Sequence, residues 1–73
     1  MMFTEAVLHL EADELVQIER DVEHRVVVLE VYKRDRYVRR SIAERELYLN
    51  LNSTERLLER ILTEMLQELR GIG

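Results

Sequence analysis

Apolar side chains recur at helical spacing along the last third of this 73-residue chain. At about 100° per residue, they cover roughly 180° of the circumference of a helix predicted over residues 53–70. A helix that lies on one face of a sheet needs an apolar stripe of only about 100°. We therefore expect one edge of this arc, at Leu62 and Leu66, to stay exposed in a monomer and to be covered by another chain. The residues predicted to form this partner interface are Leu58, Leu62, Met65, Leu66 and Leu69. The alternative is that loops of the same chain cover the edge.

Residues suited to helix ends bound this segment on both sides. Asn52 and Ser53 are good N-cap residues, and Glu55 follows Asn52 at the spacing of a capping box. Arg70 suits the negative C-terminal end of a helix, and Gly71 can adopt the left-handed conformation that ends it. These signals predict one well-delimited helix.

The middle of the chain predicts a β-hairpin. Residues 25–32 form a run rich in β-branched side chains, which lose rotamer freedom in a helix and suit a pleated surface. Residues 33–36 form the predicted turn, and residues 37–42 the returning strand. The sequence therefore predicts two paired antiparallel strands here.

Three further segments complete the predicted order. Residues 3–10 and the strictly alternating residues 46–51 are expected as strands, with a bulge or irregular piece near 43–46. Residues 13–23 place Leu15, Ile18 and Val22 at spacings of three and four, which predicts a short helix. The expected fold is a single α+β domain over residues 1–73 in the order β-α-β-β-α, a small antiparallel sheet with helices on one face. The alternative is an all-α helical hairpin or bundle, since the chain has no proline and no glycine before Gly71.

Composition narrows the class of protein. Apolar residues make up 47%, which is typical of a folded domain, and there is no cysteine for disulfides or thiolate metal sites. No signal peptide or apolar run of about 20 residues is seen, so we expect a soluble, cytoplasmic protein. Ten arginines against one lysine are compatible with a thermophilic source.

Charge is distributed unevenly around the net value of −4. Residues 1–24 carry a net charge of −6, and residues 33–45 carry +4. Arginine forks bind phosphates and tyrosine stacks on unpaired bases, so the basic band predicts a nucleic-acid contact. The predicted contact residues are Lys33, Arg34, Arg36, Tyr37, Arg39 and Arg40. The alternatives are a solvated hairpin tip or pairing with the acidic N-terminal third.

Catalytic and metal-binding patterns are weak. His9 and His24 do not share a metal-ligand spacing, and Asp21, Glu23 and His24 would need a pocket to act as general acid and base. No glycine-rich loop is present to bind phosphate. We expect a non-enzymatic protein without cofactor or metal, with its histidines at the surface.

The predicted order is similar to that of the small dimerising accessory subunits of the KEOPS tRNA-modification complex. Residues 6–10 followed by 13–15 look like their first strand and helix, and residues 47–51 like their last strand before the final helix. Their last helix usually carries an arginine followed four residues later by asparagine, whereas here Arg60 is followed by Glu64. The resemblance implies a non-catalytic scaffold that pairs with a related subunit and contacts tRNA.

Two functions are therefore expected. The first is an interaction subunit that forms a homodimer or heterodimer through the C-terminal helix, in a tRNA-modification complex if the resemblance holds. The alternative is an RNA- or DNA-associated module that binds through the basic hairpin at 33–40.

Overall fold

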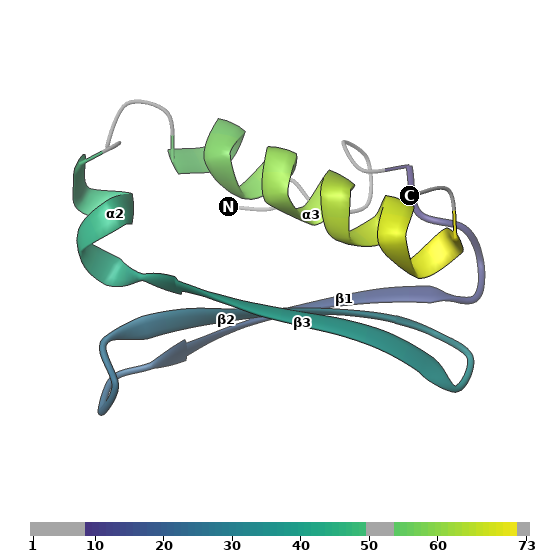
Figure 1. Ribbon diagram of the computed structural model, residues 1–73, viewed down its shortest axis with the longest axis horizontal. Helices are drawn as coiled ribbons and strands as arrows, with labels where there is room; N and C mark the ends of the chain where they lie inside the picture. The colour runs from purple at the N-terminus through teal and green to yellow at the C-terminus, as the bar shows by residue number, and fades with distance from the viewer. Residues whose placement is uncertain (1–8, 50–53, 72–73) are drawn as a thin grey trace.

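The computed structural model describes residues 9–49 and 54–71. Three strands, β1 (Glu14–Asp21), β2 (Val26–Lys33) and β3 (Arg36–Ala43), precede two helices, α2 (Glu44–Leu49) and α3 (Thr54–Arg70). The strands form one antiparallel sheet in the order β1-β2-β3, and α3 lies across one face of it (Figure 1). The α+β class is confirmed, and the all-α alternative is wrong. The observed order is β-β-β-α-α, so the predicted β-α-β-β-α order is also wrong.

The central hairpin forms where the β-branched run predicted it. Val31 of β2 pairs with Val38 of β3, and Tyr32 pairs with Tyr37. The turn between these strands consists of Arg34 and Asp35. Both predicted strands are thus confirmed to within one residue at each end.

The helix predicted over residues 13–23 is wrong, because this segment is strand β1. Ile18 pairs with Leu29 of β2, and Val16 pairs with Val31. The helical spacing of Leu15, Ile18 and Val22 was accidental. The β-branched residues of this segment suit a strand equally well, and the adjacent edge of β2 supplied the hydrogen bonds that decided the outcome.

The strand predicted over residues 46–51 is also wrong where the structure describes it. Residues 44–49 form helix α2, with Glu44 and Glu46 in its first turn, where the positive end of the helix dipole favours carboxylates. The backbone amide of Glu44 donates to the carbonyl of Arg25, which fixes the start of α2 beside the β1–β2 turn. The predicted irregularity near 43–46 is the point at which β3 ends and α2 begins. Residues 50–53, with their predicted caps, lie outside the described residues, as do residues 3–8 of the strand expected over 3–10. His9 and Leu10, at the end of that prediction, are not in a strand.

Helix α3 is confirmed, and it ends at Gly71, whose φ of 79° is left-handed as expected. Its apolar side packs against β2 and β3. The core cluster joins Leu29 and Val31 of β2 and Ile42 of β3 to Leu58, Leu62, Met65, Leu66 and Leu69 of α3.

The expected exposure of the α3 arc is wrong. Leu62 is 0% exposed and Leu66 is 2% exposed within this single chain. The cover comes from more than the sheet, since Leu10 before β1 and Leu47 of α2 also pack against the cluster. Residues of the same chain therefore cover the arc, and its width does not require a partner.

Within the described residues, neither helix combines the length and the apolar character needed to cross a membrane.

The first prediction concerns this core. Replacing Leu62 with alanine removes a fully buried side chain, and we expect it to lower the free energy of unfolding by about 2–5 kcal/mol. Leu49 is 83% exposed, so Leu49→Ala should change the free energy by less than about 0.5 kcal/mol. Urea denaturation of both variants measures the difference. Equal effects would contradict the described packing of α3.

The second prediction concerns backbone strain. Arg25, in the β1–β2 turn, has a φ of 57°, a left-handed conformation that costs a residue with a side chain about 1–2 kcal/mol. Glycine avoids this cost but loses about 0.5–1 kcal/mol in chain entropy, so Arg25→Gly should stabilise by about 0.5–1 kcal/mol. For a domain of this size, Tm should rise by about 2–8 °C. Arg25→Ala keeps the strain and serves as the control; a rise of the same size in Arg25→Ala would assign the effect to the lost charge instead.

Candidate functional site

The sheet has one covered face and one open face. Side chains at alternate positions of each strand point to opposite sides, and the register places Val16, Val31 and Val38 together on the side that packs against α3. The intervening positions form the other side, which we call the open face. It comprises Leu15, Gln17, Glu19, Asp21, Val26, Val28, Glu30, Tyr32, Tyr37, Arg39, Ser41 and Ala43.

One end of the open face is apolar. Leu15, Tyr32 and Tyr37 lie in one row across the three strands, and Leu15 and Tyr37 are 60% and 61% exposed. The rings of Tyr32 and Tyr37 stack, with centroids 5.9 Å apart. Partial burial and then the Glu30 carboxylate raise the pKa of Tyr32 above its usual value. This row is a solvent-exposed apolar surface. Tyrosines form surfaces of this kind where proteins contact each other.

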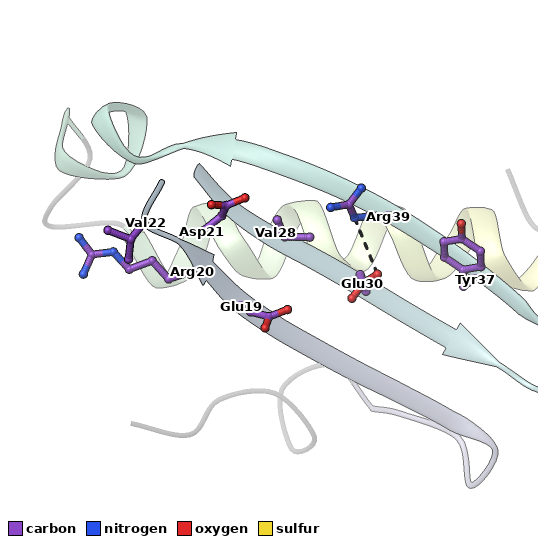
Figure 2. A pocket seen from close by; sticks show the side chains of 8 residues that line it. All are labelled: Glu19, Arg20, Asp21, Val22, Val28, Glu30, Tyr37 and Arg39. Carbon is purple, nitrogen blue, oxygen red and sulfur yellow. Dashed lines mark ion pairs between the residues drawn. The ribbon is translucent and has the colours of Figure 1, made fainter. Parts of the chain in front are cut away.

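The rest of the open face contains a shallow hollow of about 600 Å³. Figure 2 shows Val28 at its centre, with the carboxylates of Glu19, Asp21 and Glu30 around it and Arg39 beside Glu30. The closest charged atoms of Arg39 and Glu30 are 3.8 Å apart. Arg20 lines the hollow as well, so three carboxylates and two guanidinium groups surround it and its charge is close to balanced.

The structure does not keep the predicted basic band together as a nucleic-acid surface. Lys33 contacts the carboxylates of Glu11, Asp13 and Glu14, and Arg34 pairs with Asp13 at 3.1 Å. These bonds raise the pKa of Lys33 and lower that of Asp13. The alternative of pairing with the acidic N-terminal third is therefore confirmed for this end of the band.

The other members of the band lie on two different faces. Arg40 points to the helix side and contacts Glu64 and Glu68 of α3, at 3.7 and 3.0 Å. Tyr37 and Arg39 lie on the open face, and Arg36 is exposed on the side of Lys33 at the start of β3. Lys33, Arg34 and Arg40 are thus held by carboxylates of the same chain, whereas Arg39 has only the longer contact of 3.8 Å with Glu30.

A buried ion pair that the sequence did not predict ties α3 to β1. The side chain of Glu14 is fully buried and accepts two hydrogen bonds from the guanidinium of Arg70, one of them 2.6 Å long at Nε. The amide of Glu11 donates a further hydrogen bond of 2.9 Å to the same carboxylate. The Arg70 hydrogen bonds lower the pKa of Glu14 to about 2, although burial acts in the opposite direction. No local signal pairs two residues 56 positions apart, so only the tertiary structure reveals this contact.

The candidate catalytic residues Asp21, Glu23 and His24 lie at the surface of the protein. His24 is exposed in the β1–β2 turn, where its Nδ1 is 2.8 Å from the carboxylate of Asp21. Hydrogen bonds from the His24 ring and amide lower the pKa of Asp21. Glu23 is exposed beside them, and His9 is exposed in the turn before β1. The surface placement of both histidines is confirmed, and residues 9–49 and 54–71 contain no carboxylate and histidine cluster that could hold a metal ion.

All five residues predicted for the partner interface lie in the core of the single chain. The outward side of α3 carries polar residues instead, among them Arg56, Arg60 and Gln67. Among the described residues, the exposed large apolar side chains therefore lie on β1, the β1–β2 turn, β3 and α2, and not on α3.

Comparisons with protein families, with curated proteins and with solved structures find no match to this chain. The resemblance to KEOPS accessory subunits stays an untested prediction.

The third prediction follows from the Glu14–Arg70 pair. A carboxyl group whose pKa is lowered on folding stabilises the folded state above its unfolded pKa, near 4.5. This stabilisation should decline as the pH falls from about 4.5 to about 2. Glu14→Gln should destabilise the protein at pH 7 by about 1.5–3 kcal/mol, the range for hydrogen bonds to charged groups. In the same variant, the free energy of unfolding should fall less steeply as the pH is lowered below about 4.5. Urea denaturation at a series of pH values measures this acid limb.

The control for this pair is a half-buried carboxylate of α3. Glu59→Gln removes an acid that forms no comparable pair in the described part of the chain and should leave the acid limb intact. Parallel acid limbs for wild type and Glu14→Gln would contradict the lowered pKa of Glu14.

Proposed function

We propose that this protein is a non-enzymatic interaction subunit that docks another protein on the open face of its sheet. The observation that carries the proposal is the row of Leu15, Tyr32 and Tyr37, in which Leu15 and Tyr37 are exposed and Tyr32 is half-buried, on a sheet that a helix covers on one side only. An antiparallel sheet with one solvated face normally presents polar side chains there. Apolar side chains at the solvated face mark a contact surface.

The position of the charges supports the same function. The apolar row adjoins a hollow with carboxylates at its rim and Arg39 at one side, so a docking surface would have an apolar part and a polar rim. Tyrosine and arginine are also the side chains that most often dominate binding energy at protein interfaces.

The surface position of the candidate acid–base residues supports a non-enzymatic role. Glu23 and His24 are exposed in the β1–β2 turn, and Asp21 is half-buried at the end of β1. General acid–base catalysis works best on a substrate held in a pocket with tuned pKa values. A docking role needs no such pocket.

Nucleic-acid association through the basic hairpin stays the second candidate from the sequence. The carboxylates that hold Lys33, Arg34 and Arg40 weaken it, because phosphate would have to displace them. A place in a tRNA-modification assembly follows from the resemblance alone, and the docking proposal does not depend on it.

The fourth prediction tests docking in the cells that produce the protein. A photo-crosslinking residue at position 37 should form protein adducts, because Tyr37 lies in the proposed contact. The same residue at position 67 of α3 serves as the control, since Gln67 is exposed on the charged side. Leu15→Glu should reduce the adducts at position 37 by at least about tenfold, as expected for a charge placed in an apolar contact. Identical adducts at positions 37 and 67 would refute the proposal.

A further inference from the structure

Strand β3 forms one edge of the sheet, because among the described strands it pairs with β2 alone. Lys33 and Arg36 flank the two-residue β2–β3 turn and form a hydrogen-bonded pair. Such pairs alternate along an antiparallel ladder, so the backbone groups of Tyr37, Arg39 and Ser41 point away from β2. These three residues are exposed, and no turn or helix in the described part of the chain hydrogen-bonds to them through its backbone. The edge therefore presents a row of N–H and C=O groups to a further strand.

The side chains along this edge are basic. Strand β3 carries Arg36, Arg39 and Arg40 and no carboxylate. Arg40 is already held by Glu64 and Glu68 of α3. Arg39 is 60% exposed and has only its 3.8 Å contact on the open face, and Arg36 is exposed without an ion pair inside residues 9–49 and 54–71. Two guanidinium groups are thus available to a partner.

We propose that the protein that docks on the open face contributes an extended acidic segment, which pairs with the outer edge of β3 as a fourth, antiparallel strand. This inference rests on the proposed function and names the chemistry of the partner. In strand addition, main-chain hydrogen bonds supply affinity and alternate side chains supply specificity. An antiparallel strand continues the pattern of this sheet and is slightly more stable per residue than a parallel one.

The positions of the two guanidinium groups define the acidic segment. Arg36 lies on the helix side of the sheet and Arg39 on the open face, three residues away. The added strand therefore needs two carboxylates three residues apart, about 10 Å along the strand and on opposite faces. Between them, the residue opposite Val38 should be apolar, because Val38 packs against the core cluster. The residue opposite Tyr37 should be β-branched or aromatic, as in favourable cross-strand pairs.

The described edges of a second copy of this chain do not supply such a strand. The carboxylates of β1 are Glu14, Glu19 and Asp21, and no two of them are three residues apart. Glu14 is also buried against Arg70. Two β3 edges would repel each other, which is the usual effect of cations on an edge strand. The arginines of β3 thus disfavour pairing between copies and select an acidic partner.

A ten-residue peptide that repeats Glu-Val-Thr three times and ends in Glu tests the inference, because its carboxylates recur every third residue. An NMR titration of the isotope-labelled full chain should give a dissociation constant on the order of 100 µM. In the complex, the amide protons of Tyr37, Arg39 and Ser41 should exchange with solvent more slowly, because they bond to the added strand. The amides of Val38 and Arg40, which already bond to β2, should change little.

Two control peptides separate strand addition from simple attraction between charges. Proline in place of each threonine keeps the charge but removes the N–H group opposite Tyr37, so the slower amide exchange should be lost. Glutamine in place of each glutamate keeps the N–H groups but removes the charge, so binding should weaken by at least about tenfold.

Variants of the protein test the two arginines. Arg36→Glu and Arg39→Glu should each weaken binding of the acidic peptide by at least about fivefold. A peptide with lysine in place of each glutamate should bind the double variant more tightly than the wild type, because the charges are then exchanged. Arg56→Glu, at an exposed position of α3, makes the same charge change and should have no effect.

Three results would overturn the inference. The first is no binding of the acidic peptide at about 1 mM, and the second is binding that leaves the exchange of the Tyr37, Arg39 and Ser41 amides unchanged. The third is an oligothymidylate that binds more tightly than the peptide through Arg36 and Arg39, which would assign the edge to nucleic acid. If the peptide fails to bind while position 37 still crosslinks to another protein in cells, strand addition is wrong and the docking function stands. If position 37 gives no specific adduct either, both are wrong.

Discussion

The packing of α3 against one face of β2 and β3 is the constraint on which the rest of this structure depends. Leu62, Met65 and Leu69 are almost completely buried there, so the single helix accounts for most of the core. One helix covers only one side of a three-stranded sheet (Figure 1). The existence of an open face, and with it the candidate site, follows directly from this one-sided core.

Charged side chains hold the two layers in register at several places. Glu14 and Arg70 join the start of β1 to the end of α3, and Arg40 of β3 contacts Glu68 of α3. Arg20 and Glu44 form a further contact between β1 and the first residue of α2. The acidic and basic segments of the sequence thus pair with each other within the chain. Fewer basic side chains therefore remain to bind an external polyanion.

If the proposed interaction surface lies on the sheet and not on α3, the protein suits a different kind of partner. A leucine seam on a helix would bind another amphipathic helix, whereas the open face suits a flat surface with apolar and charged parts. Leu15 and Tyr37 are exposed to solvent, and the ion pair of Arg39 with Glu30 is long, at 3.8 Å. These properties favour a weak and reversible contact over permanent assembly.

The sequence by itself determined the elements whose signals are local. The β-branched run of β2, its returning strand β3 and the amphipathic α3 with Gly71 at its end were predictable, because propensity and periodicity act over neighbouring residues. The fold class followed from those three elements. Of the candidate site, the sequence analysis identified Tyr37 and Arg39 as surface residues, but it assigned them to a nucleic-acid contact.

Only the tertiary structure decided the remaining features. Residues 14–21 became a strand because β2 offered an edge, and residues 44–49 became a helix that helps to cover the α3 arc. The burial of Leu62, the pairing of Glu14 with Arg70 and the open face all depend on contacts between segments far apart in the chain. Such contacts leave no periodic signal in the sequence, because their energy depends on which surfaces meet after the elements have formed.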